Sequence, residues 1–321
     1  MKMLFGLIVS ATALLTASAS ADIYPSKPIK FIVPFAAGGP ADALARIFAE
    51  RFSAELGQPV VIENRLGAGG VTGVNLVAKA DPDGYTLGIG SSGGLAISAT
   101  LQQNMPYDSL RDLTLITQAV SAPELLAINP KVPANTLDEF ITLARNNPGK
   151  FTFASSGSGG MPHLAGELLN MTAKVQITHV PYTGAAPAVN DLMSGHVSSM
   201  FADAPVLLGA LQGGKLKALA VGSRTRIRVL PDVKTTQELG WPDIEADNWY
   251  GIIAPAKLPA DIAAKIHKAA VTALQTSSVK EKLESQGFGV VASSSQDFAA
   301  YVRYETARWN KVIKTGNIKG E

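Results

Sequence analysis

The sequence has 321 residues, of which 46% are hydrophobic and 17% charged, so its length fits about two domains and its composition excludes a disordered chain. Lys and Arg total 28 against 26 Asp and Glu, and the formal charge of +2 is too balanced for a nucleic-acid binder that works by counterion release. The absence of cysteine excludes disulfides, iron–sulfur clusters, thiolate zinc sites and a cysteine nucleophile.

Residues 1–21 have the pattern of a cleaved signal peptide. A positive Lys2 precedes an apolar stretch over residues 4–15, and small residues at 19 and 21 stand just before Asp22. The alternative is a membrane anchor, but the apolar stretch is shorter than the ~20 residues that a spanning helix needs. We therefore expect a mature chain that begins at Asp22 and lies in the periplasm.

The next hundred residues alternate between strands and helices. Compact β-branched runs predict strands at 29–33, 60–62 and 85–89. Leu44, Ile47, Phe48 and Phe52 fall at helical spacing, and Gly57 supplies a stop signal. A second helix follows a glycine loop and carries Val74, Val77 and Ala78. This rhythm predicts an α/β fold with a mainly parallel sheet and helices on both faces.

A second set of elements follows with the same rhythm. We expect strands at 125–128, 151–154, 178–180, 199–201 and 218–221, with helices at 137–145 and 164–171. A strand at 249–253 is expected to return to the first domain. The tail is expected to be helical, with one apolar face around Ile266 and Ala273 and another that runs from Phe298 to Ile313. Because a glycine loop precedes a helix in both halves, two similar lobes facing each other are predicted.

Two of these loops could hold an anion. In the first, Phe35, Ala37, Gly38, Gly39 and Asp42 lie between a strand and a helix. The first turn of a helix has unpaired N–H groups and a partial positive charge, and glycine lets a carboxylate approach them. The loop at 155–163 has the same construction, with Ser156 and Ser158 as donors. For each loop alone, the competing interpretation is a tight turn, with Asp42 as a helix cap.

Two motifs suggest enzymes instead. Gly90 to Gly94 match G-x-S-x-G around Ser92, with Ser91 before it, which is the pattern of a hydrolase nucleophile elbow. That reaction also needs a late histidine on a loop, whereas His267 lies in an amphipathic helix, so a serine-lined binding loop is the better interpretation. The loop at 67–73 has dinucleotide-like glycines with the wrong spacing and no suitably placed acid.

The remaining polar candidates are single side chains. The four histidines do not have zinc-ligand spacing. His163 follows the second glycine loop, where its ring could reach a carboxylate or hold the loop. Thr183 belongs to a polar turn near a strand end, and Asp203 is either a partner for an amine or a helix cap before Pro205.

Several segments, in order along the mature chain, resemble the Bug (TctC-like) family of substrate-binding receptors of tripartite tricarboxylate transporters. The similar segments are residues 24–39, 63–70, 80–87, 163–168, 179–184 and 215–221. The resemblance implies a two-lobed periplasmic binding protein of the type II-like, Venus flytrap kind, each lobe a mainly parallel sheet flanked by helices. It implies that 22–121 plus 248–321 form lobe I and 122–247 form lobe II, with hinges near 121–126 and 247–252.

The resemblance also implies a site. Phe35–Gly39 would match the family's carboxylate-holding loop, and Ser156, Ser158 and His163 the opposing loop. This chain departs from the family pattern at Gly160, where relatives usually have serine, and Asp203 falls at a variable position.

The sequence therefore predicts a monomeric receptor that binds a small mono- or dicarboxylate between its lobes, with membrane permease subunits as partners. No cofactor, metal or nucleic acid is expected, and no catalysis. Two alternatives remain: a secreted serine esterase that uses Ser92, and a module that senses the same ligands without transport.

Overall fold

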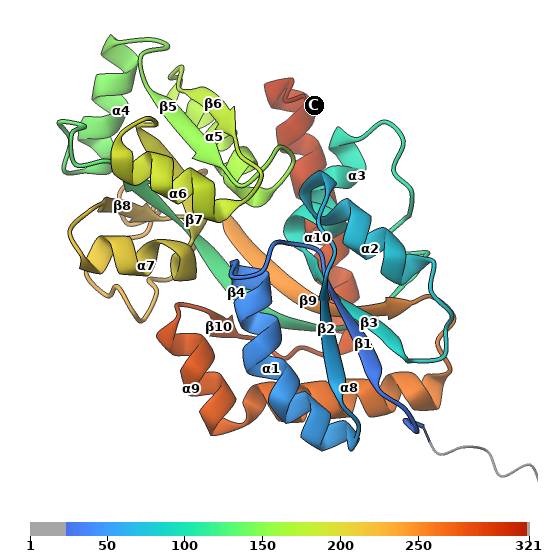
Figure 1. Ribbon diagram of the computed structural model, residues 1–321. Helices are drawn as coiled ribbons and strands as arrows, with labels where there is room; N and C mark the ends of the chain where they lie inside the picture. Colours follow the sequence, from blue (N-terminus) through green and yellow to red (C-terminus); the bar gives the residue numbers. More distant parts are fainter. Residues whose placement is uncertain (1–23, 320–321) are drawn as a thin grey trace, which may run out of the picture.

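The computed structural model describes residues 24–319, so the signal-peptide prediction lies outside the described residues. The strands form one continuous arrangement in the order β2-β1-β3-β9-β4-β7-β5-β6, with β8 and β10 also paired to β4. Helices pack around two halves of this arrangement, which gives an α/β fold with two lobes (Figure 1). The predicted fold class is confirmed.

The first lobe is built on parallel strands. β1 (Ile29–Val33) pairs in parallel with both β2 (Val60–Asn64) and β3 (Thr86–Ser91). Between these strands lie α1 (Pro40–Leu56), η1 (Ala68–Gly70) and α2 (Val71–Ala78). The π-helical turn η2 (Gly93–Ile97) and α3 (Ser98–Leu101) follow β3. Helix α1 ends where the sequence predicts, because Gly57 adopts the left-handed φ of 74° that terminates helices.

The second lobe repeats this arrangement. β5 (Thr152–Ser155) pairs in parallel with β6 (Thr178–Pro181) and with β7 (Ser199–Asp203), while β8 (Lys217–Val221) is antiparallel to β4. Its helices are α4 (Leu137–Asn146), α5 (Met161–Ala173), α6 (Ala185–Ser194) and α7 (Ala204–Gln212). The predicted parallel pairs are therefore present in each lobe.

Antiparallel strands connect the lobes. β4 (Leu113–Ile128) has 16 residues, far more than the strand predicted at 125–128. Its first part pairs with β9 (Asp247–Pro255), as far as Pro123 opposite Asp247, and its last part pairs with β7, beginning with Glu124 opposite Asp203. The strand thus changes partners at Pro123 and Glu124, and Figure 1 shows it running from one lobe into the other.

The tail completes the first lobe and also reaches the second. α8 (Ala260–Gln275), α9 (Ser277–Ser285) and β10 (Gly289–Val290) lead into α10 (Ser295–Gly316). Near the start of α10, Phe298 and Val302 pack in a cluster with Trp249 of the first lobe. Near its end, Trp309 packs in the core of the second lobe. The predicted apolar stripe is confirmed, and it spans both lobes.

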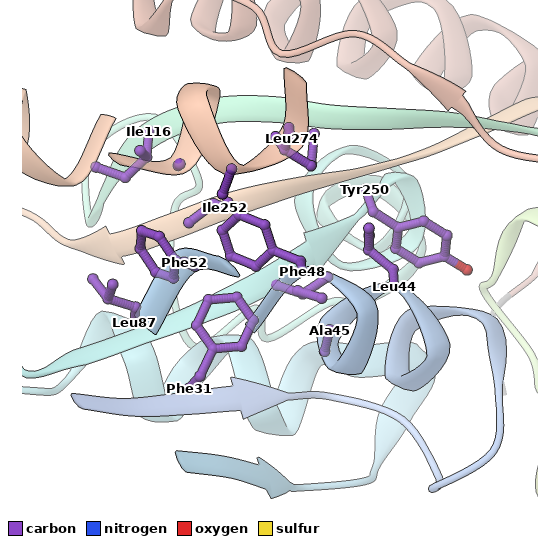
Figure 2. Close-up of a cluster of buried hydrophobic side chains, with 14 of the residues drawn as sticks. Phe31, Leu44, Ala45, Phe48, Phe52, Leu87, Ile116, Tyr250, Ile252 and Leu274 are labelled. Carbon is purple, nitrogen blue, oxygen red and sulfur yellow. The ribbon is translucent and has the colours of Figure 1, made fainter. Parts of the chain in front are cut away.

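Aromatic packing fixes helix α1 to the sheet of the first lobe. Phe31 of β1 packs against Phe48 and Phe52 of α1 (Figure 2). The rings of Phe48 and Phe52 stack with their centroids 4.5 Å apart. All three side chains are fully buried, and each such side chain contributes about 1.5–3 kcal/mol to folding by leaving water. This packing holds the N-terminus of α1 at the edge where the strands end.

Candidate functional site

A cavity of about 720 Å³ lies between the lobes, where the parallel strands of both lobes end. From the first lobe it is lined by Pro34 after β1, Leu66 after β2 and Ser91 at the end of β3. From the second lobe it is lined by Ser156, Pro181 and Asp203, which stand at the ends of β5, β6 and β7. Ligands of open α/β sheets bind at this edge of the strands.

Five helices begin at the cavity wall. The lining includes the residues that immediately precede helices α1, α2, α5, α6 and α7, which are Gly39, Gly70, Gly160, Gly184 and Asp203. In the described part of the chain, no side chain caps the first-turn N–H groups at these five starts. Because these donors carry the positive end of the helix dipole, the wall is suited to an anion.

The first glycine loop divides into residues that line the cavity and residues that support them. Phe35 and Gly39 line it, whereas Ala37, Gly38 and Asp42 do not. The Gly38 N–H donates to Asp42 Oδ2 at 2.9 Å, so this N–H is already used inside the loop. Of the residues predicted in this loop, Phe35 and Gly39 therefore line the cavity, whereas Asp42 supports the loop from outside the cavity.

Asp42 is held by several donors at once. Arg46 donates to both of its carboxylate oxygens, and Asn64 donates to Oδ1 at 2.9 Å and to the carbonyl oxygen of Phe35 at 3.0 Å. Burial alone would raise the pKa of Asp42, but the hydrogen bonds from Arg46, Gly38 and Asn64 lower it. The side chain therefore stays ionised and fixes the loop between β1 and α1.

The second glycine loop shows the same division. Ser156 and Ser158 line the cavity, and the buried Ser158 Oγ has no hydrogen-bond partner among the described residues. His163 is not part of the lining; its Nδ1 accepts the Gly159 N–H at 3.2 Å, and its ring stacks on His179 with centroids 4.1 Å apart. His163 thus supports the loop, which is the second of the two roles that the sequence left open.

His179 extends that support into the sheet. Its Nε2 lies 2.7 Å from Ser155 Oγ, and its ring also stacks on Phe153. Burial lowers the pKa of His179 to about 4, so the ring is neutral at neutral pH. A neutral imidazole can stay packed beneath the loop without a counter-ion.

A hydrogen-bonded network forms the inner wall of the cavity, and all four of its members line the cavity. Ser92 Oγ donates to Asn248 Oδ1 at 2.5 Å, and Asn248 Nδ2 donates to Asp203 Oδ1 at 2.9 Å. The Tyr250 hydroxyl donates to Asp203 Oδ2 at 2.5 Å. The network joins β3, β9 and β7, so it spans both lobes.

The acids beside this network are difficult to ionise. Burial raises the pKa of Asp203 to about 6, although the bonds from Tyr250 and Asn248 oppose the rise. Burial raises the pKa of Asp247 to about 7. The pKa of Glu124 lies well above its usual value because of burial and the charges of Asp203 and Asp247. Two carboxyl groups, those of Asp203 and Glu124, are therefore buried beside the half-buried Asp247 where β4 and β9 pass between the lobes.

Some lining residues were not predicted. The loop at 67–73, interpreted as packing, lines the cavity with Gly67, Gly69 and Gly70, and a Cβ on Gly69 would lie 3.3 Å from the Ser158 carbonyl oxygen of the other lobe. The sequence signal that could have identified this loop is the strand–glycine–helix pattern that it shares with the loops at 35–42 and 155–163. Asn248 and Tyr250 had no comparable signal, because they lie within a strand that has the pattern of core. Ser91, Ser92 and Thr183 line the cavity, as selected from the sequence.

Charge is scarce in this wall. Asp203 is the one charged side chain among the described residues that line the cavity.

Within residues 24–319 no group of three or more His, Asp or Glu side chains could hold a metal ion. No helix in the same range is long and apolar enough to cross a membrane.

The two lobes, the crossing strands and the cavity between strand ends define the class of two-lobed periplasmic binding proteins. The model of the tripartite tricarboxylate transporter family receptor matches residues 44–318. Protein BugT of Bordetella pertussis is 37% identical over 313 residues, which cover 97% of this chain and 96% of BugT. The chain therefore belongs to the tripartite tricarboxylate transporter receptor family, and the resemblance to Bug proteins is confirmed.

Two solved relatives contain carboxylates. A protein of R. palustris solved with adipate is 34% identical with a TM-score of 0.88, and the match covers 92% of this chain and 99% of that one. MatC from Rhodopseudomonas palustris, solved with bound malate, is also 34% identical, with a TM-score of 0.85 and coverage of 90% and 100%. Both have the two-lobed fold described above.

Proposed function

We propose that this protein is an extracytoplasmic receptor that closes around a small organic mono- or dicarboxylate and delivers it to a tripartite tricarboxylate-type membrane transporter. The observation that carries the proposal is the meeting of five helix N-termini, uncapped by side chains, at one cavity between two lobes. Such donors bind carboxylates without any cationic side chain. The relatives solved with adipate and malate support the same ligand class.

The residues that line the cavity indicate how the ligand is bound. We propose that the lobes comprise 22–121 plus 248–321 and 122–247, and that they hinge where β4 and β9 cross between them. Closure brings Gly39 and Gly70 from one lobe and Ser158 and Gly160 from the other to opposite sides of the ligand. It replaces water around the carboxylate with N–H and O–H donors, which offsets the cost of burying the charge.

No chemical step is part of the proposal. The partner of Ser92 is the amide of Asn248, which cannot take up a proton as a general base. The esterase alternative therefore lacks support at the residue on which it depends. We propose a monomer that is exported to the periplasm and loses its signal peptide by cleavage on the N-terminal side of Asp22. Intact-mass measurement of the exported protein tests that cleavage site.

Thermal-shift screening tests the ligand class. The purified protein is heated with a panel of mono-, di- and tricarboxylates and with the corresponding amides. We expect stabilisation by at least one carboxylate and none by its amide, because binding to the folded state raises the melting temperature. Stabilisation by amides and carboxylates alike, or by no carboxylate, contradicts the proposal. Transport rather than sensing is tested by whether loss of the protein abolishes uptake of that carboxylate by cells.

A further inference from the structure

We propose that the ligand places a cationic nitrogen against Asp203, so that the favoured ligand is an amino carboxylate rather than a dicarboxylate. The inference rests on the proposed function, because it specifies the far end of the same ligand. It begins from an asymmetry of the cavity, which offers helix N-termini at its glycine loops and one full negative charge at the end of β7.

Asp203 has unused capacity as an acceptor. It is only 4% exposed, and its two oxygens each receive one neutral donor, from Asn248 and Tyr250. A carboxylate can accept about four hydrogen bonds, so about two sites are left. No ion pair with Asp203 is present among the described residues. A buried carboxylate that lacks a cation is costly unless a ligand supplies one.

Glu124 is a second acidic side chain beside Asp203. It stands directly opposite Asp203 in the antiparallel pairing of β4 with β7, so both side chains lie on the same face of the sheet. Glu124 is fully buried, and neither of its carboxylate oxygens has a hydrogen-bond partner within residues 24–319. A second carboxylate from a ligand would be repelled by the Asp203 charge, whereas an ammonium group would be attracted to it.

The other end of the ligand has suitable partners in the glycine loops that line the cavity. The carboxylate would be held by the first-turn N–H groups of α1 and α5 and by Ser158 Oγ, which is buried and has no other partner among the described residues. The dipole of α7, which begins immediately after Asp203, is directed at Asp203 itself. It moderates the negative charge at this end without providing a full positive one.

Calorimetric titration with three matched series tests the inference. The probes are 4-aminobutanoate, 5-aminopentanoate and 6-aminohexanoate, each compared with the unsubstituted monocarboxylate and the dicarboxylate of equal carbon number. We expect at least one amino carboxylate to bind about tenfold more tightly than both of its counterparts. This size of preference corresponds to a charge-assisted hydrogen bond.

Two variants locate the preference. Asp203→Asn should reduce it to about twofold or less while the monocarboxylates still bind. Glu50→Gln makes the same change of charge at an exposed site on α1 and should leave the preference intact. Circular dichroism checks that both variants are folded, and the comparison of ligands on the parent protein does not depend on them.

The outcomes separate the two proposals. If dicarboxylates or plain monocarboxylates bind as tightly as every amino carboxylate, or if Asp203→Asn is folded and keeps the preference, the inference is wrong and the receptor proposal stands. If no carboxylate of any series binds, the receptor proposal falls together with the inference.

Discussion

Ser92 and Asn248, which are 156 positions apart in the sequence, are joined by a buried hydrogen bond of 2.5 Å. Asn248 Oδ1 also accepts the backbone N–H of Trp249, and Asn248 Nδ2 reaches Asp203. The amide thus connects the end of β3 in one lobe with the end of β7 in the other. It also gives the hydroxyl of Ser92 a partner that orients it without removing its proton.

The first prediction concerns the reactivity of Ser92. A fluorophosphonate probe labels serines that an adjacent base activates, and Asn248 is not a base. We expect intact-mass measurement to show no adduct after incubation with the probe. Labelling that disappears in Ser92→Ala would restore the esterase alternative.

The second prediction concerns contact between the lobes at Gly69. Its φ is +63°, and an added Cβ would lie 3.3 Å from the Ser158 carbonyl oxygen in the opposite lobe. Gly149 is a matched control, with φ +72° and nothing within 4 Å of an added Cβ. Alanine at either position should cost about 1–2 kcal/mol of stability through backbone strain.

Only Gly69→Ala should also weaken carboxylate binding, because the closed lobes would have to separate slightly. Denaturant unfolding measures the shared loss of stability, and calorimetric titration with the carboxylate found by thermal shift measures binding. Equal affinities for the two variants would show that the contact between Gly69 and Ser158 does not limit closure.

The third prediction concerns the support of the first loop by Asp42. Asp42→Asn removes the charge that holds Arg46 and the Gly38 N–H, so stability should fall by about 1.5–3 kcal/mol. Because the pKa of Asp42 is lowered in the folded protein, this contribution is present above its unfolded pKa and lost as pH falls through the folded value. Urea unfolding at neutral and acidic pH measures it.

Asp261→Asn, at an exposed position in the first turn of α8, is the control and should change stability little. A folded Asp42→Asn protein with unchanged stability and ligand affinity would show that the loop does not depend on this carboxylate.

The fourth prediction concerns Glu124. Its pKa is raised well above the usual value, so between the unfolded and folded pKa values the folded protein binds more protons than the unfolded chain. Stability from this residue therefore falls as pH rises through that interval. Glu124→Gln does not ionise, so its free energy of unfolding relative to the parent should be higher at pH 8 than at pH 5.

Urea unfolding of both proteins at the two pH values gives this difference, and Glu50→Gln serves as the exposed control. A difference between Glu124→Gln and the parent that is the same at both pH values would mean that Glu124 does not resist ionisation in the folded protein.

Local patterns in the sequence predicted much of the framework. The strand at 29–33 has the predicted bounds, and α1 ends at Gly57, because β-branched runs and a left-handed glycine act over a few residues. The glycine loops at 35–42 and 155–163 were placed at strand ends for the same reason. The length of β4 was not predicted, since its first part is specified by pairing with β9, far away in the sequence.

The sequence also could not predict which site residues line the cavity and which ones support the lining. Gly38 and Asp42 bond to each other, and His163 stacks on His179 beneath its loop, so these residues support the wall instead of lining it. Such roles depend on side-chain direction and on contacts such as that between α5 and β6. Asn248 and Tyr250 were missed because polar side chains inside a buried strand have no spacing that marks them.

Amide chemical-shift mapping shows whether backbone N–H groups of the glycine loops bind the carboxylate. The labelled protein is titrated with the carboxylate that gives the largest thermal shift and then with its amide. We predict large, saturable shifts at Gly160 and Gly184 with the carboxylate, and small ones with the amide. Saturable carboxylate binding that leaves these two amides unchanged, or equal shifts with both compounds, would contradict binding by these N–H groups.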